Sequence, residues 1–353
     1  MQPGIGNRSA CRSGRYYISG GYPGLPRAHV AAGFYRDECM IKNVDPSLVE
    51  LHHTILAEYI ISKGLPATEP EFLARGVNNV LYRFDLAGRQ VVAKIGTNCF
   101  YRQLHIEFEV LRRLYGISPA GIDFFTDKQR YTQVLLLEFA EGRHPFVFQG
   151  DMMRNVGAVI ARYHQIDEPV AAVPVETCRN FLENRILQVP GMLCRKAHLG
   201  MFNRCYRTAL DCTERMEPLL NSGRRVLVHG DLIPLNIIAD RFGFLKIIDW
   251  EGARYDAPEA DLATLVKAFG LNDAQTEELF AAYGLPVDRT VFLFRLAVHY
   301  LQVIAWRLAV QIPGGPDEEN EKAAAELAVE FSTVQELFSR LVRTLPAVSG
   351  ISV

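Results

Sequence analysis

The sequence predicts an α+β protein of two lobes, in which a small N-terminal lobe built on a β-sheet precedes a larger, mainly helical C-terminal lobe. Two observations lead to this prediction. Up to about residue 142, segments with helical spacing alternate with short β-type runs, whereas the chain beyond is largely helical in its spacing. The chain also has 353 residues, and hydrophobic cores tend to split beyond about 250–300 residues.

The first 44 residues are predicted to form a flexible N-terminal extension. Residues 1–36 contain seven Gly, three Pro and five Arg, have no acidic residue and show little periodicity. No continuous apolar run follows the arginines, so we expect no secretory signal and a cytoplasmic protein. Met40 is an alternative natural start within this extension.

The N-terminal lobe, residues 45–142, is predicted to begin with a helix and a β-hairpin. Asp45 as the N-cap, Pro46 in the first turn and Gly64 as the stop enclose a segment with apolar residues three and four positions apart. Two β-type runs, VLYRFDL and QVVAKIG, follow and are joined by a tight turn at Ala87 and Gly88.

A second helix and two more strands complete this lobe. The segment YRQLHIEFEVLRRLYG has helical spacing and ends at Gly116. The segments GIDFFTD and YTQVLLLEFAEG have the composition of strands. The order of helix, hairpin, helix and strands therefore predicts a lobe that ends near Gly142.

The C-terminal lobe, residues 143–353, is predicted to be mainly helical. Helices are expected at DMMRNVGAVIARYHQI, around residues 200–221, and as about three helices from Asp261 to Leu345. Only the stretch from Val226 to Asp256 has β-type sequence. There we interpret RVLVHG and FLKIIDW as the two strands of a β-hairpin, separated by a loop that contains Pro234.

Composition favours a small molecule as the partner. The chain is 49% hydrophobic, 22% charged and carries a net charge of −2, which is not the electrostatic footprint of a nucleic-acid-binding protein. The longest apolar stretch, TVFLFRLAVHYLQVIAWRLAV, is interrupted by four polar residues, so no membrane span is predicted. The seven cysteines form no C-x-x-C pair, which disfavours a disulfide framework or a zinc site.

Polar residues at the ends of the two central strands suggest phosphoryl transfer. Asp231 and Asn236 lie five positions apart in one loop, and Asp249 follows the second strand. Phosphoryl transfer needs an acceptor for the proton of the attacking hydroxyl and hard oxygen ligands for Mg²⁺. Two carboxylates and an amide carbonyl facing one space would supply both.

These motifs resemble a known family. H-G-D-x-x-x-x-N, which starts at His229, and the following I-D-W-E are similar to motifs of the aminoglycoside phosphotransferase and choline kinase family. The segments GVNNVLYRF, QVVAKIG, LLLEFAEG and VGAVIARYHQ match further family segments in the same order, and the resemblance extends from roughly Glu71 to Phe269. It implies a protein-kinase-like fold. The segment GVNNVLYRF departs from the kinase pattern because it contains Gly76 but no G-x-G-x-x-G, so Asn78, Asn79 and nearby amides would cradle the phosphates.

The resemblance implies a role for individual residues. The donor would be ATP, with GTP as an alternative, and Lys94 would hold its α- and β-phosphates. Glu107 would pair with Lys94, although Glu109 is a rival for that place. The other implied nucleotide-binding residues are Asn79 and, through backbone groups at the adenine, Glu138 and Ala140. Asp231 would be the catalytic base, Asn236 and Asp249 would bind Mg²⁺, and His229 and Asp261 would support the catalytic loop.

Several residues carry open alternatives. Asp261 opens the run DLATLVKAF and is predicted as a helix N-cap unless it serves the catalytic loop. Arg295 and His299 belong to a polar stripe that either faces solvent or lines the substrate pocket. Glu251 and Asp256 are further candidates for contacts with the substrate.

We therefore expect an ATP-dependent phosphotransferase that moves the γ-phosphate to a hydroxyl of a small molecule, such as an aminoglycoside, another antibiotic, an amino alcohol or a sugar. The alternative is a catalytically silent pseudokinase that binds nucleotide as a regulatory module. The substrate and the oligomeric state are left open by the sequence.

Overall fold

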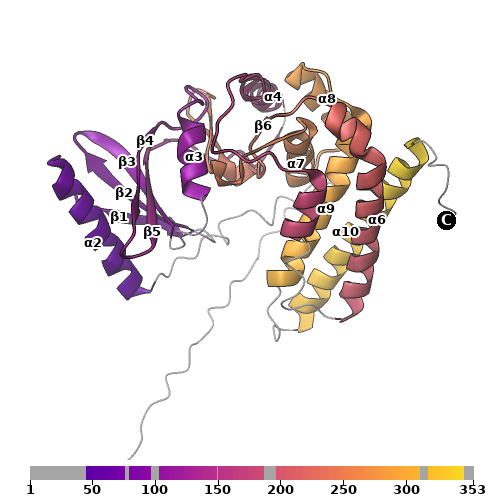
Figure 1. Cartoon of the computed structure of the whole chain (residues 1–353), viewed down its shortest axis with the longest axis horizontal. Helices are drawn as coiled ribbons and strands as arrows, with labels where there is room; N and C mark the ends of the chain where they lie inside the picture. Colours follow the sequence, from indigo (N-terminus) through magenta and orange to yellow (C-terminus); the bar gives the residue numbers. More distant parts are fainter. Residues whose placement is uncertain are drawn as a thin grey trace, which may run out of the picture.

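The computed structural model describes residues 45–75, 79–96, 103–148, 150–186, 196–310 and 317–345. The predicted extension over residues 1–44, with Met40, lies outside the described residues, as does Asn78 of the predicted nucleotide loop. The described chain forms a smaller lobe around a β-sheet and a larger helical lobe, which lie side by side in Figure 1. The α+β prediction is confirmed.

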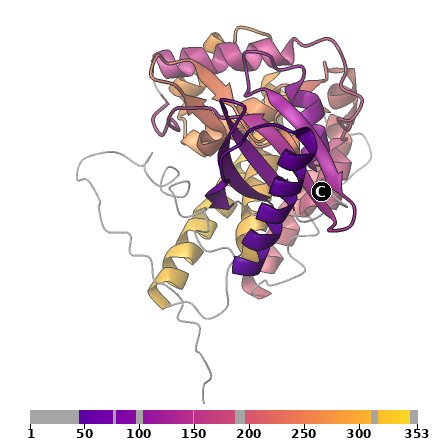
Figure 2. The same cartoon turned by 90° about the vertical axis from the view of Figure 1, so that its left-hand side faces the viewer.

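The N-terminal lobe contains a five-stranded antiparallel sheet in the order β1-β2-β3-β5-β4. Helix α2 covers the face turned away from the C-terminal lobe, as Figure 2 shows, and α3 lies between the sheet and that lobe (Figure 1). The elements are α2 (Pro46–Lys63), β1 (Glu71–Arg75), β2 (Asn79–Leu86), β3 (Arg89–Gly96), α3 (Gln103–Leu111), β4 (Gly121–Asp127) and β5 (Thr132–Glu138).

Local sequence explains the first helix and the hairpin. The Asp45 side chain accepts a hydrogen bond from the N–H of Ser47 at 2.9 Å, and Gly64 ends α2 with a left-handed φ of 63°. Ala87 and Gly88, both with positive φ, form the tight turn between β2 and β3. The predicted capped helix and β-hairpin are therefore confirmed.

Alternation along the strands determines which side chains face the other lobe. In β3, Val91, Ala93 and Ile95 are buried in one cluster with residues of α2. Because successive side chains of a strand point to opposite faces, Lys94 faces α3 and the C-terminal lobe. Strand β1 was not predicted, because only Ala74 of its five residues is buried and the sequence lacks alternation there.

The C-terminal lobe is formed mainly by helices that pack on one large hydrophobic core. Helix α9 lies within this bundle and contacts α6, α7 and α10. Four helices, rather than about three, follow the central β-type stretch. The elements are α4 (Asp151–His164), α5 (Cys178–Phe181), η3 (Leu182–Ile186), α6 (Lys196–Ser222), α7 (Glu259–Phe269), α8 (Asp273–Tyr283), α9 (Arg289–Val310) and α10 (Asp317–Thr344).

Helix α9 is the only helix of the described residues that is long and apolar enough to cross a membrane by length and composition, and 56% of that span is buried inside the protein. Its polar stripe is buried too: Arg295 and His299 are only 6% and 9% exposed. The solvent-facing alternative for these two residues was therefore wrong. Packing of α9 among three other helices explains why these two side chains are covered.

The central stretch forms two separate ladders rather than the predicted hairpin. Strand β6 (Val226–Val228) pairs with β9 (Arg254–Asp256), and β7 (Ile237–Ala239) pairs with β8 (Leu245–Ile247). The predicted hairpin of RVLVHG with FLKIIDW was therefore wrong. The first run pairs with β9 and the second with β7, and both partners are only three residues long, too short for a recognisable strand pattern in the sequence. One loop, which contains η4 (Pro234–Asn236), joins β6 to β7, and a second turn, η5 (Trp250–Gly252), lies between β8 and β9.

Candidate active site

The loop after β6 holds the predicted base, Asp231, next to Asn236. The Asn236 side-chain Nδ2 donates to the Asp231 carbonyl oxygen at 2.8 Å and to its carboxylate Oδ2 at 3.2 Å. Gly230 has a φ of 83°, and a Cβ there would lie 2.4 Å from the carbonyl oxygen of Gly252. Only glycine fits this close crossing of the two loops, which fixes the backbone just before Asp231.

His229 braces this loop through both ring nitrogens. Its Nε2 lies 2.8 Å from the carbonyl oxygen of Ile248, and its Nδ1 lies 3.2 Å from the N–H of Asp231. An Nε2–H donor and an Nδ1 acceptor satisfy both contacts, so the network assigns a neutral imidazole. Burial lowers the pKa of His229 in agreement with that form.

Asp261 is a buried hub beneath the same loop. Its carboxylate accepts hydrogen bonds from the N–H groups of His229 and Gly230, at 2.8 and 3.0 Å, and from the Tyr163 hydroxyl at 2.7 Å. Burial acts to raise the pKa of Asp261, but the hydrogen bonds from His164 and from the N–H of Gly230 oppose it, and the pKa is lowered to about 2. The N-cap prediction was wrong, because α7 begins two residues earlier.

Lys94 and Glu107 come together across the N-terminal lobe. Lys94 Nζ lies 2.7 Å from Glu107 Oε2, and both side chains are buried. Burial would lower the pKa of Lys94, but the carboxylates of Asp249, Glu107 and Glu251 raise it, so the ammonium stays charged. The rival Glu109 instead contacts Arg112, just beyond the end of α3.

Asp249 occupies a strained turn that carries it to Lys94. Its φ of 68° is left-handed, which is uncommon for a residue other than glycine and persists only where the surroundings impose it. Its carboxylate contacts the Lys94 ammonium directly. Burial acts to raise the pKa of Asp249, but the charge of Lys94 outweighs it and holds the pKa below its ordinary value.

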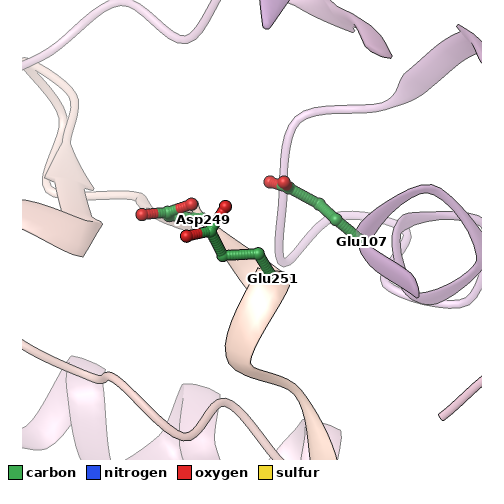
Figure 3. Close-up of side chains that lie close together, drawn as sticks. All are labelled: Glu107, Asp249 and Glu251. Atoms are coloured by element: carbon green, nitrogen blue, oxygen red, sulfur yellow. The ribbon is translucent and has the colours of Figure 1, made fainter. Parts of the chain in front are cut away.

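The structure places Glu251, which the sequence suggested as a substrate contact, beside Lys94 and Asn79. Its Oε2 accepts from Asn79 Nδ2 at 2.7 Å and lies 3.5 Å from Lys94 Nζ. Glu107, Asp249 and Glu251 offer oxygen atoms that all lie within 4.8 Å of one another, and Figure 3 shows their carboxylates facing a common space. In this structure the Lys94 ammonium pairs with all three carboxylates, and carboxylate oxygens gathered in this way also fit a hard divalent cation.

The Asp231 carboxyl has a perturbed pKa. The residue itself is exposed on one side, but surrounding protein partly desolvates the carboxylate, and Asp249 and Glu251 add negative charge nearby. Together these effects raise the pKa of Asp231 to about 7. A carboxylate tuned to neutral pH can accept a proton where an ordinary aspartate is a weak base.

The predicted adenine contacts lie at the end of β5. The N–H of Glu138 is occupied, since it donates to the Ala120 carbonyl oxygen at 2.9 Å, and the next N–H, of Phe139, donates to Gln90 at 3.1 Å. Within the described residues, the N–H of Ala140 makes no backbone hydrogen bond. Of the predicted pair, Ala140 thus retains a backbone donor for a ligand.

The remaining candidate substrate contacts lie inside the C-terminal lobe. Asp256, Arg295 and His299 are all buried, and Asp256 forms ion pairs with Arg295 and with Arg254. The structure therefore does not bring these three residues to a surface. The sequence analysis did not identify Arg254 as the partner of Asp256. Its place shortly after I-D-W-E was the only indication of such a role.

Two aromatic residues that support the site were also missed. Tyr163 donates to Asp261, as described above, and the Trp250 indole Nε1–H donates to the Ser118 hydroxyl at 2.9 Å. Trp250 is fully buried and its ring packs against those of Tyr163 and His229. Trp250 stands within I-D-W-E, so the motif itself was the available signal.

Comparison with known proteins identifies the family of the chain. The sequence model described as the phosphotransferase enzyme family matches residues 69–294, well over half of the chain. No curated protein matches the sequence significantly.

Solved structures show the same fold at low sequence identity. Choline kinase LicA from Streptococcus pneumoniae is 16% identical, with a TM-score of 0.60 over 80% of this chain and 99% of that one. A choline/ethanolamine kinase family protein from Mesorhizobium loti is 20% identical, with a TM-score of 0.57 over 78% and 92%. Spectinomycin phosphotransferase APH(9)-Ia, in complex with ADP and spectinomycin, is 17% identical, with a TM-score of 0.53 over 80% and 98%. The fold is therefore protein-kinase-like.

Proposed function

The chain belongs to the phosphotransferase enzyme family, and from this premise we propose that it transfers the γ-phosphate of ATP to a hydroxyl group of a small molecule. The observation that carries the proposal is the meeting of Lys94, Asp249 and Asp231. A buried ammonium, paired with Glu107, lies against one carboxylate, and a second carboxylate of raised pKa stands on the adjoining loop. Lys94 can bind phosphates, Asp249 can bind a cation, and Asp231 can accept a proton, which are the three tasks of phosphoryl transfer.

In this proposal, the two lobes hold the two ends of the nucleotide. Lys94 contacts the phosphates, held in place by Glu107 as in the structure. The N–H of Ala140 and the carbonyl of Glu138 bind the adenine edge. Asp249, Asn236 and Glu251 offer oxygen ligands for Mg²⁺, which when bound neutralises charge that develops on the phosphates.

Asp231 acts on the acceptor in this proposal. Its carboxylate orients the hydroxyl and takes its proton as the acceptor oxygen bonds to the γ-phosphorus and the bond to the leaving ADP oxygen breaks. A pKa near 7 suits this role, because the group is partly deprotonated at neutral pH and still basic enough to accept the proton. His229 and Asp261 keep the loop in position through the hydrogen bonds described above.

The acceptor class follows from chemistry common to the similar structures. Their names include a choline kinase and a spectinomycin phosphotransferase, and both choline and spectinomycin carry hydroxyl groups. We therefore place the acceptor among hydroxyl-bearing small molecules, with amino alcohols and aminoglycoside-like antibiotics as the first compounds to test.

The test is Asp231→Asn, which keeps the size of the side chain and removes the proton acceptor. Transfer of phosphate from Mg·ATP to choline, ethanolamine, spectinomycin, hygromycin B and kanamycin is followed by a coupled ADP assay. We expect the wild type to phosphorylate at least one acceptor and the variant to lose at least a hundredfold in kcat, because removal of a general base typically costs 10²–10⁴-fold. Binding of Mg·ADP, measured by calorimetry, should change by less than threefold.

Two outcomes would overturn the proposal. Normal turnover by Asp231→Asn would exclude this residue as the base. Binding of Mg·ADP without transfer to any acceptor of a broad hydroxyl panel would instead favour a pseudokinase. Asp240→Asn is the matched control, since Asp240 shapes the exposed turn between β7 and β8 and should leave turnover unchanged.

A further inference from the structure

Asn79 of the N-terminal lobe contacts η5 of the C-terminal lobe, the short turn that contains Glu251 and directly follows Asp249. It belongs to the predicted nucleotide segment, is the first residue of β2, and pairs with Gly96 at the end of β3. Its side-chain Nδ2 donates to Glu251 Oε2 at 2.7 Å, across 172 positions of sequence. A carboxylate only accepts hydrogen bonds, so the amide group must present its NH₂ to Glu251. The donor end of Asn79 is thus committed to a carboxylate rather than to the nucleotide loop.

Gly96 leaves room for the other end of the Asn79 amide. A Cβ at position 96 would lie 3.0 Å from Asn79 Oδ1, so a larger residue there would crowd the oxygen. The Asn79 backbone belongs to the paired strand β2, and its NH₂ end is bonded to Glu251 of the second lobe. Asn79 therefore links the sheet directly to Glu251.

The turn that receives this hydrogen bond needs support from the N-terminal lobe. Asp249, at the start of this turn, adopts a left-handed φ. A residue other than glycine keeps such a conformation only where several contacts with its surroundings hold it there. Lys94 contacts Asp249, and Glu107 Oε1 accepts from the N–H of Trp250 at 3.3 Å. The Trp250 indole donates to Ser118 of the same lobe, and Asn79 adds a further attachment, an uncharged side chain that acts on Glu251.

We propose that Asn79 is a positioning residue, which orients the Glu251 carboxylate for a divalent cation held between Glu251 and Asp249. This inference rests on the proposed function, because the cation would accompany the nucleotide. With Oε2 held by the amide, Oε1 of Glu251 is presented in a fixed direction. The same Oε2 already forms an ion pair with Lys94 Nζ at 3.5 Å, so without the amide the carboxylate would close further on that ammonium and occupy both the cation ligand and the phosphate-binding group.

The test uses Asn79→Leu in the full chain, because leucine keeps the approximate volume and removes the donor. Mn²⁺ binding without nucleotide is measured by electron paramagnetic resonance, and Mg·ADP binding by calorimetry. We expect both affinities to fall about tenfold, the low end of what a hydrogen bond to a charged group contributes. Affinity for ADP in EDTA should change by less than twofold, since Asn79 acts on the cation site rather than on the nucleotide.

A double-mutant cycle separates action through Glu251 from any other role. Glu251→Ala removes the partner, so adding Asn79→Leu to it should change Mn²⁺ affinity by less than twofold. If the two effects multiply instead, Asn79 acts independently of Glu251 and the inference is wrong. A loss of ADP affinity in EDTA would show direct contact with the nucleotide and would also overturn it.

A second variant and a control guard against simple loss of folding. Gly96→Ala keeps Asn79 but intrudes on its oxygen end, so it should weaken Mn²⁺ binding in the same direction while the far-ultraviolet spectrum stays unchanged. Asn155→Leu removes a donor of the same kind, which bonds the Gly243 carbonyl oxygen at 3.4 Å in the turn between β7 and β8. This control should leave Mn²⁺ affinity unchanged.

Failure of the inference and failure of the proposed function look different. If the wild type transfers phosphate and Asn79→Leu binds Mn²⁺ normally, only the role of Asn79 is refuted. If the wild type binds Mg·ADP in an Asn79-dependent manner but phosphorylates no acceptor, only the transfer reaction is refuted. A wild type that binds neither Mn²⁺ nor Mg·ADP would refute both.

Discussion

At the scale of single residues, Asp231 links the chemistry of the site to the stability of the fold. Partial desolvation and the neighbouring carboxylates of Asp249 and Glu251 raise its pKa to about 7. An unfolded aspartate titrates near 3.9, so between about pH 4 and pH 7 the native state binds more protons at this position than the unfolded state does. Ionisation of Asp231 therefore lowers the stability of the native protein as the pH rises through this window.

Asp231→Asn should consequently be more stable than the wild type above pH 7. Asparagine carries no charge at any pH, so the difference in melting temperature should be largest near pH 8 and should shrink as the pH falls toward 4. Differential scanning calorimetry at pH 5, 6, 7 and 8 measures it. Asp240→Asn serves as the control for a surface aspartate. A difference that is constant with pH, or that grows toward acid, would contradict the raised pKa.

At the scale of elements, helix α9 is joined to strand β9 by a buried ion pair. Asp256 of β9 contacts Arg295 of α9, and the Nε of Arg254 lies 3.1 Å from Asp256 as well. All three side chains are no more than 6% exposed. Removing one partner of a buried pair leaves a charge that has been taken from water without full compensation.

Arg295→Met should therefore lower the free energy of unfolding by about 3–5 kcal/mol, which is typical of a broken buried pair. The matched control is Arg289→Met on the same helix, where the exposed pair with Glu277 is expected to contribute about 1 kcal/mol or less. Urea unfolding followed by circular dichroism measures both variants. If the two substitutions lowered the free energy of unfolding equally, the buried pair of Asp256 would stabilise the protein no more than the exposed pair of Arg289.

These elements also show what sequence could and could not predict. Local rules of capping, turns and alternation determine the capped helix α2, the β2–β3 hairpin and strand β5. All three were predicted. Strand β9 was missed because its three residues, Arg254–Asp256, gain their structure only by pairing with β6. The hydrogen bond of Asn79 to Glu251 could not be predicted either, since it depends on how the two lobes pack together and no local sequence pattern indicates that contact.

At the scale of the whole molecule, the two larger hydrophobic cores of the described residues do not follow the division into lobes along the sequence. One core contains Ile55 and Leu56 of α2 with the buried face of the sheet. Leu104, Val110 and Leu111 of α3 instead belong to the large core shared with the C-terminal helices. Glu107 reinforces this attachment by accepting from the N–H of Trp250. By its packing, α3 is therefore part of the larger lobe, although the sequence places it between strands of the smaller one.

Native-state hydrogen exchange should reveal this division, because residues that share a core open together in cooperative units. The amides of α3 near Val110 should become exposed with the same free energy as those of α4, whereas the amides of α2 should open with a different one, together with β2. Mass spectrometry at increasing denaturant concentration follows the three helices in one experiment. Trp250→Phe removes the indole hydrogen bond to Ser118 but keeps most of the ring, so it should bring the opening free energies of α3 and α4 down together by about 1 kcal/mol and leave that of α2 unchanged. If α3 opened with α2 in the wild type, the attachment of α3 to the larger core would have no energetic meaning, and Lys94 and Glu107 would have to be treated as members of one independently moving lobe.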